Sequence, residues 1–130
     1  MLAVLLGAWQ LANGSVLLGA VYLLGFGVLA VLVSPRAFPR SVPDSEARAS
    51  SALDGRPIVY WRPGCPFCIR LRTALGRDAK RLLWVDIWSD ADGAARVRSV
   101  ADGNETVPTV VTVDRSYVNP APHLVRGLSS

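Results

Sequence analysis

The 130-residue sequence contains only two cysteines, one histidine and one lysine, and these scarcities exclude several classes of protein. Two cysteines cannot form the disulfide framework that stabilises many small secreted domains. A structural zinc site needs about four ligands, and His123 is far in sequence from both cysteines, so no metal site within the chain is expected. The basic residues, 13 of 14 of them arginine, are scattered without a block interleaved with aromatics, which argues against nucleic-acid binding.

Charge is absent from the first 33 residues. Val16–Val33 is an uncharged run of 18 residues, close to the roughly 20 apolar residues that cross a bilayer core as a helix. We expect one transmembrane helix, because Asn13-Gly14-Ser15 interrupts the apolar sequence and leaves too few residues for two spans. Residues 1–12 would prolong a tilted helix or lie at the membrane interface. A cleaved signal peptide is disfavoured by the lack of Lys or Arg before the run, and a buried core helix by the lack of a polar face.

The flanks of this run predict its orientation. Arg36, Arg40 and Arg48 follow the run and no Lys or Arg precedes it, so the positive-inside rule places the C-terminal part in the cytoplasm. Residues 34–55 carry Pro35, Pro39 and Pro43 with little apolar periodicity. They predict an irregular tether, with at most a turn or two of helix over 47–53. The expected organisation is an anchor over 1–33, a linker over 34–55 and a domain over 56–130.

The pattern of the domain alternates between short apolar runs and helical periodicity. Its order predicts an α/β fold with a thioredoxin-like βαβαββα arrangement, two parallel strands joined by a right-handed crossover and then an antiparallel hairpin. Trp84 and Trp88, four residues apart, are expected to pack in the core or at the sheet edge. The expected elements are strands at 57–61, 81–88, 108–113 and 116–118, and helices at 65–75, 89–100 and 119–128.

Both cysteines lie in Trp61-Arg62-Pro63-Gly64-Cys65-Pro66-Phe67-Cys68, at the junction between the first strand and the first helix. A Cys-x-x-Cys pair in this place is typical of a thiol–disulfide active site. Cys65 is the predicted nucleophile, because the helix N-terminus favours its thiolate, with Arg62 and Arg70 adding positive potential. Cys68, one turn on, is expected to be more buried and either resolves a mixed disulfide or only tunes Cys65. Two buried, inert cysteines are the structural alternative.

Three segments of the domain resemble the glutaredoxin family, and most closely the mycoredoxins, glutaredoxin-like proteins that work with mycothiol. The first is Tyr60–Cys68, with its Cys-Pro-Phe-Cys sequence. The second is Gly103-Asn104-Glu105-Thr106-Val107-Pro108-Thr109-Val110, and the third is Val118-Asn119-Pro120. The resemblance covers the domain but not residues 1–55. Glutaredoxins that use glutathione usually carry Gly-Gly and an acidic pair after the hairpin, and this chain has Asn119-Pro120 there.

The resemblance implies further roles around Cys65. Pro108 is expected to follow a cis peptide bond that places the backbone of Val107 beside Cys65, where a thiol substrate pairs with it. Thr106 would hydrogen-bond the same substrate, and Arg62 stands where the family has a basic residue for the carboxylate of the thiol. No bound cofactor is implied. Mycothiol is the expected co-substrate, with glutathione disfavoured.

The expected function is a membrane-tethered, cytoplasm-facing thiol–disulfide oxidoreductase that reduces mycothiol–protein mixed disulfides, or protein disulfides, through Cys65. Its partners would be a low-molecular-weight thiol, oxidised or thiolated proteins and the membrane, with no nucleic acid. Two alternatives stay open. One is a dimeric module that holds an iron–sulfur cluster through Cys65, and the other is an exported dithiol oxidoreductase. His123 is expected to be a surface residue.

Overall fold

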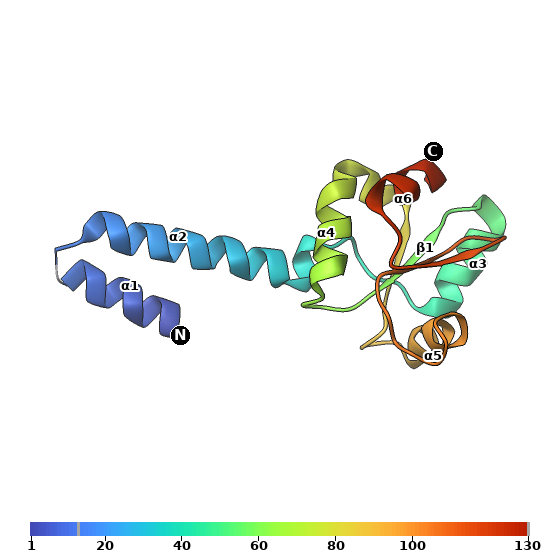
Figure 1. The fold of residues 1–130 in the computed structure, drawn as a ribbon, viewed down its shortest axis with the longest axis horizontal. Coiled ribbons are helices and arrows are strands. Elements are labelled where there is room, and N and C mark those ends of the chain that lie inside the picture. Colours follow the sequence, from blue (N-terminus) through green and yellow to red (C-terminus); the bar gives the residue numbers. More distant parts are fainter. Residues whose placement is uncertain (13, 130) are drawn as a thin grey trace. The chain divides into compact units, whose positions relative to one another are not determined.

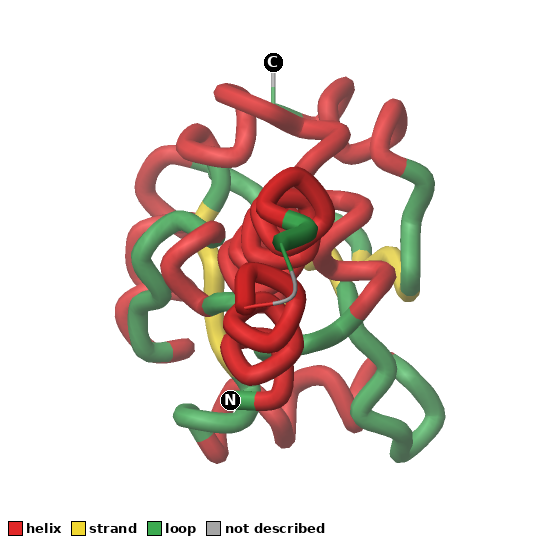
Figure 2. Tube along the Cα trace, turned by 90° about the vertical axis from the view of Figure 1, so that its left-hand side faces the viewer, coloured by secondary structure: helices red, strands yellow, loops and turns green. Residues whose placement is uncertain are grey.

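The computed structural model describes residues 1–12 and 14–129, which divide into two compact units, 1–37 and 38–130. The first unit contains α1 (Leu2–Ala12), α2 (Val16–Val33) and a short 3-10 helix, η1 (Pro35–Ala37). α1 and α2 lie side by side and run in opposite directions (Figures 1 and 2). A Cβ atom added at Gly7 would lie 3.0 Å from the side chain of Leu23, so the glycine permits this close approach. α1 therefore folds back on α2 and does not prolong it.

α2 is long and apolar enough to cross a membrane. At 1.5 Å per residue its 18 residues extend about 27 Å, close to the thickness of a bilayer core. α1, with 11 residues, reaches only about 16 Å and is too short to span. Nearly all of the large apolar side chains of α2 are exposed and are not covered by other parts of the chain. These dimensions agree with the prediction of one candidate span.

The second unit is a four-stranded sheet with helices on both faces, as predicted. The strand order is β2-β1-β3-β4, with β1 parallel to β2 and the other neighbours antiparallel. α4 and α6 cover one face, and α3 and α5 the other (Figure 1). The strands are β1 (Ile58–Trp61), β2 (Leu83–Asp86), β3 (Thr109–Val111) and β4 (Ser116–Val118), and the helices are α3 (Asp44–Asp54), α4 (Pro66–Leu75), α5 (Ala91–Val100) and α6 (Pro122–Leu128).

The core lies around β1, whose four residues are all buried. A strand covered on both faces is expected to be continuously apolar, and Ile58-Val59-Tyr60-Trp61 is apolar apart from the hydroxyl of Tyr60 and the indole N–H of Trp61. On the α5 side, Gly93 lets the helix approach the sheet closely. A Cβ atom at Gly93 would lie 2.7 Å from Cγ1 of Val85, too near for any larger residue to fit without movement.

Several predicted boundaries differ from the structure. The predicted strands 81–88 and 108–113 are shorter, because residues 76–81 form a 3-10 helix, η2 (Gly76–Arg81), and the chain turns after Asp86 and Val111. The last helix was expected to begin at Asn119-Pro120. It begins at Pro122, because Asn119 takes a left-handed backbone conformation with φ of 48° and the second proline occupies the first helical turn, where its missing N–H does no harm.

The prediction of an irregular linker over 34–55 is wrong from Phe38 onward. The ring of Phe38 stacks on Trp61 with centroids 4.0 Å apart, and the N–H of Val42 donates to the carbonyl of Trp84 at 2.9 Å. α3 follows and packs on the sheet, where Tyr60 donates its hydroxyl proton to Oδ1 of Asp44 at 2.5 Å. Residues 38–55 are therefore part of the second unit.

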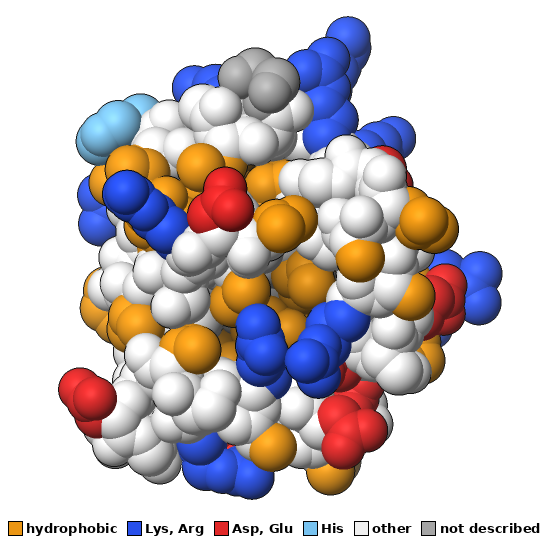
Figure 3. Space-filling model, turned by 90° about the vertical axis from the view of Figure 1, so that its right-hand side faces the viewer, with side chains coloured by type: hydrophobic (Ala, Val, Ile, Leu, Met, Phe, Trp, Pro, Cys, Tyr) orange, Lys and Arg blue, Asp and Glu red, His pale blue; other side chains and the backbone are white. Residues whose placement is uncertain are grey.

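The surface of the second unit carries dispersed charge. On the face drawn in Figure 3, Lys and Arg side chains are spread among hydrophobic and uncharged side chains and are not gathered into one basic patch. Among the described residues, arginine side chains form the ion pairs Arg48–Asp44, Arg56–Asp54, Arg81–Asp78, Arg98–Glu105 and Arg126–Asp78.

Candidate active site

Cys65 is the N-cap residue of α4. Its backbone is extended, and its Sγ accepts a hydrogen bond from the backbone N–H of Cys68 at 3.3 Å. The sulfur thus takes the place of the oxygen that usually caps a helix. Because the unpaired N–H groups and the helix dipole favour negative charge there, the position suits a thiolate. Pro66 follows in the first turn, where no N–H is needed.

Cys68 lies one turn into α4 and is fully buried. Burial raises the pKa of its thiol well above the usual range, and the hydrogen bond with Cys65 raises it further. The two cysteines are free rather than joined in a disulfide. The structure therefore describes the reduced pair, with one sulfur at the helix end and one held as a thiol behind it.

Val107 and Pro108 face this pair from another loop. The bond between them is cis, as predicted, and the carbonyl of Val107 accepts a hydrogen bond from the Cys65 thiol at 3.6 Å. The N–H of Asn119 donates to the carbonyl of Pro108 at 2.8 Å. This bond ties the segment after β4 to the loop of the cis proline, so the three segments meet at the end of α4.

A hollow opens over Cys65, and it brings together most of the residues predicted from sequence. Arg62, Cys65, Thr106 and Val107 line it. Cys68 and Pro108 are buried and do not line it. Sequence reasoning did not assign the other lining residues, which are Pro66, Phe67, Asn104, Glu105 and Asn119.

The added residues give the hollow a mixed chemical character. Phe67 is 54% exposed, which leaves an aromatic face available to a ligand. The carboxylate of Glu105 is paired with Arg98, at 2.6 Å between Oε1 and Nη1, and this pairing offsets its negative charge. The position of Phe67 inside Cys-Pro-Phe-Cys was a signal for its place at the site. Asn104 and Glu105 lie in the segment Gly103–Val110 that carries the family resemblance, and this was their only signal.

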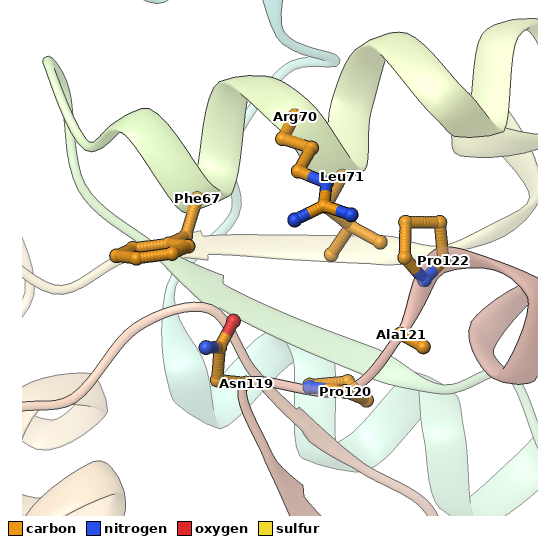
Figure 4. A pocket seen from close by; sticks show the side chains of 7 residues that line it. All are labelled: Phe67, Arg70, Leu71, Asn119, Pro120, Ala121 and Pro122. Carbon is orange, nitrogen blue, oxygen red and sulfur yellow. The ribbon is translucent and has the colours of Figure 1, made fainter.

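A second hollow lies beside the first and shares Phe67 and Asn119 with it. In Figure 4, Arg70 reaches from α4 toward the gap, and the amide of Asn119 points up from the opposite segment. Arg70 was expected to add positive potential at Cys65. The structure places its side chain in this neighbouring hollow, among Phe67, Leu71, Asn119, Pro120, Ala121 and Pro122.

The tryptophans divide between core and surface. Trp61 and Trp84 are buried, at 2% and 1% exposure; Trp61 donates its Nε1–H to Ser41 and Trp84 to the carbonyl of Ala79. The expectation that Trp88 packs in the core or at the sheet edge is wrong. It is 66% exposed, because it follows the end of β2 in a turn, and Arg62 lies over its ring. His123 is exposed, as expected.

The site contains the parts of a thiol–disulfide exchange centre. One sulfur caps a helix beside a hollow, a second cysteine in the first turn of that helix donates its backbone N–H to this sulfur, and a cis proline loop presents backbone opposite. Among residues 1–12 and 14–129, no three His, Cys, Asp or Glu side chains gather as metal ligands would. Fold and site together define the class as thioredoxin-fold thiol–disulfide oxidoreductases.

Comparison with known proteins narrows this class. The family described as Glutaredoxin matches residues 58–118. Two curated proteins of Mycobacterium tuberculosis, from strains CDC 1551 and H37Rv and each named "Putative glutaredoxin", are 42% identical to this chain over 66 residues, which cover 48% of this chain and 76% of theirs. The chain belongs to the glutaredoxin family.

Proposed function

We propose that the protein reduces mixed disulfides between proteins and mycothiol, and that Cys65 is the nucleophile. The observation that carries the proposal is the placing of Cys65 at the N-cap of α4, where it is 3% exposed and lines a hollow together with Arg62, Thr106 and Val107. Thiolate is the species that attacks a disulfide, and this position favours negative charge.

In the first step, the Cys65 thiolate attacks the mycothiol sulfur of the mixed disulfide. The old S–S bond breaks, the substrate protein leaves as a thiolate that takes a proton from water, and a Cys65–mycothiol disulfide forms. The backbone of Val107 and the side chain of Thr106 hold the bound thiol as a short added strand. Both line the hollow with Cys65.

In the second step, a second mycothiol thiolate attacks the mycothiol bound to Cys65. The products are mycothiol disulfide and the Cys65 thiolate. In the net reaction one external mycothiol replaces the protein thiol as partner in the disulfide, so the number of S–S bonds is unchanged and the external mycothiol is the reductant. An internal disulfide from Cys68 to Cys65 is the competing route. We favour the external thiol, because burial raises the pKa of Cys68 and keeps its sulfur protonated, and a thiol attacks poorly.

The preference for mycothiol over glutathione follows from the segment after β4. The γ-glutamyl end of glutathione carries both an ammonium and a carboxylate, which need an acidic side chain and free backbone N–H groups. Here the segment reads Asn119-Pro120-Ala121-Pro122. It has no acidic side chain, and its two prolines have no N–H. Mycothiol carries a neutral, hydroxyl-rich sugar portion instead, and the amide of Asn119 lies in both hollows to meet it.

The experiment compares the full chain in detergent with two substrates, the mycothiol and the glutathione mixed disulfide of one protein. We expect kcat/KM to be at least about tenfold higher with mycothiol, a difference of about 1.4 kcal/mol. The Ala121→Asp variant should narrow this ratio, since it supplies an acidic partner for the ammonium. Equal or faster turnover with glutathione would contradict the choice of thiol.

We also propose that α2 anchors the protein in the membrane with the second unit on the cytoplasmic side. The length and apolar character of α2 support the anchor. The arginines that follow it, Arg36, Arg40 and Arg48, support the orientation, because basic residues are retained on the cytoplasmic side. The reducing cytoplasm would keep Cys65 and Cys68 as thiols.

A further inference from the structure

Trp88 is an exposed aromatic residue that the proposed mechanism does not use. It lies in the turn after β2, where its N–H donates to Oδ1 of Asp86 at 2.9 Å. The preceding residue, Ile87, donates its N–H to the carbonyl of Trp61 at 2.9 Å. Because Trp61 and Asp86 are opposite each other in the parallel pair β1–β2, this bond fixes the turn of Trp88 beside the loop that follows β1.

Arg62 stands in that loop and lies over the ring of Trp88. Its Cζ atom is 6.0 Å from the ring centroid, at the limit of the range in which a guanidinium is attracted to an aromatic face. Arg62 also lines the hollow over Cys65. The indole of Trp88 is 66% exposed, so packing in the core does not account for its place. Its contact with Arg62 connects it to the site.

We propose that Trp88 is a positioning residue that holds the guanidinium of Arg62 at the hollow of Cys65. The inference rests on the proposed function for its substrate, a mixed disulfide of a small thiol. An arginine side chain loses considerable rotamer freedom when it is fixed on a ligand. A ring that already restricts the side chain reduces that loss, so binding of the small thiol is strengthened. Positive charge is also held where the Cys65 thiolate forms.

The first test is a double-mutant cycle on the full chain in detergent, with the mycothiol mixed disulfide as substrate. We expect Trp88→Ala to raise KM about two- to fivefold, the factor that an exposed cation–π contact supplies, with kcat little changed. Trp88→Phe should restore most of the loss, because it keeps an aromatic face. In the Arg62→Ala background, Trp88→Ala should have no further effect. Val113→Ala, which trims another exposed apolar side chain away from the hollow, is the control.

If Trp88→Ala raised KM by the same factor in the Arg62→Ala background as in the parent, the inference would be overturned, because Trp88 would then act without Arg62. No change in KM in the parent background would overturn it as well. If Cys65→Ser turned over the substrate as fast as the parent, the proposed function would fail. The positioning role of Trp88 would then be tested by the second experiment, which does not depend on turnover.

The second test measures the alkylation rate of Cys65 by anionic iodoacetate and by neutral iodoacetamide, with the modified peptide identified by mass spectrometry. The ratio of the two rates reports the positive charge near the sulfur, since the thiolate fraction cancels. We expect Arg62→Ala to lower the ratio of the iodoacetate rate to the iodoacetamide rate about fivefold, as for one charge at contact distance in water. Trp88→Ala should lower this ratio about twofold, and Trp88→Phe should give a ratio near that of the parent. A ratio unchanged in Trp88→Ala would overturn the positioning role.

Discussion

At the scale of single residues, the two sulfurs of one motif occupy different surroundings. The Cys65 sulfur receives the N–H of Cys68, and Cys65 lines the hollow although it is only 3% exposed. Cys68 is fully buried and does not line the hollow. Burial penalises a charged sulfur, and the hydrogen bond with Cys65 adds to the penalty, so the pKa of Cys68 is raised. One helical turn therefore separates a cysteine that lines the hollow from one that does not.

This difference predicts how stability depends on pH. A thiol whose pKa is higher in the folded than in the unfolded state binds its proton more tightly when the protein is folded. Its stabilising effect is therefore complete below the pKa of the unfolded thiol, near 8.5. The effect is lost as the pH rises above that value. The free energy of unfolding of the reduced protein should fall above about pH 8.5, by up to about 1.4 kcal/mol per pH unit from Cys68. In Cys68→Ala the decrease in the free energy of unfolding that Cys68 causes should be absent.

The measurement is urea unfolding of the full chain in detergent at several values between pH 7 and 10, with a reductant present. The two proteins differ only at position 68. Parallel curves for the parent and Cys68→Ala would contradict the raised pKa. The free energy of unfolding should fall more steeply with pH in the parent than in Cys68→Ala.

At the scale of elements, α3 completes the sheet face that β1 and β2 begin. Asp44, at the start of α3, is 2% exposed. Its carboxylate accepts the hydroxyl proton of Tyr60 at 2.5 Å, and its N–H donates to Oδ2 of Asp90 at 2.6 Å. These polar contacts, together with the small buried residues Ala47 and Ser51, dock the helix.

Removing the hydroxyl in Tyr60→Phe should therefore destabilise the protein. Oδ1 of the buried Asp44 would lose its donor, while Oδ2 keeps its ion pair with Arg48. A buried polar atom left without its partner costs about 1–3 kcal/mol. Urea unfolding of the full chain checks this value. Tyr117→Phe on the half-exposed strand β4 is the matched control and should change the free energy of unfolding by less than about 0.5 kcal/mol. A similar small change in Tyr60→Phe would show that the contact is not what docks α3.

The boundary of the second unit gives another prediction. A truncated chain of residues 38–130 should be soluble and unfold cooperatively, because it keeps Phe38 on Trp61 and the whole of α3. A chain of residues 56–130 should aggregate or unfold without a cooperative transition, since Trp61 and Trp84 lose the ring that covers them. Equal urea midpoints for the two truncations would contradict this account of residues 38–55.

Sequence reasoning succeeded where local signals decide the structure. The apolar run of β1, the Cys-Pro-Phe-Cys motif and Thr106-Val107-Pro108 each carry a short-range pattern, and they located the sheet, the helix and the cis proline. The sequence predicted only a turn or two of helix over 47–53, whereas α3 spans Asp44–Asp54. Its packing on the sheet was missed because it uses a buried carboxylate, an alanine and a serine, which form no hydrophobic stripe. The burial predicted for Trp88 was wrong because its hydrophobicity suggested a core position, whereas the chain turns after Asp86 and leaves its side chain exposed.

At the scale of the whole molecule, an apolar helical unit precedes a unit that carries all of the site residues. The first, over 1–37, contains the candidate span α2. The second, over 38–130, contains the sheet and both cysteines. Covalent attachment to a membrane helix would confine the exchange reaction to substrates that reach the membrane surface.

This arrangement predicts the distribution of the protein in cells. The full chain should stay in the membrane fraction after alkaline carbonate extraction, whereas residues 38–130 should be soluble. A maleimide that cannot cross membranes should label Cys65 only after the cells are permeabilised, and a permeant maleimide, as the control, should label it in intact cells. Labelling of intact cells by the impermeant reagent would place the second unit outside and contradict the proposed orientation.

The central claim is that Cys65 takes the small thiol from a mixed disulfide. Its most direct test is the mass of the intermediate formed when the full-length Cys68→Ser variant meets one equivalent of a mycothiol–protein mixed disulfide. We predict a mass increase equal to one bound mycothiol, located on the peptide that contains Cys65, and none in Cys65→Ser. An adduct of Cys65 with the substrate protein, or no adduct at all, would contradict the account.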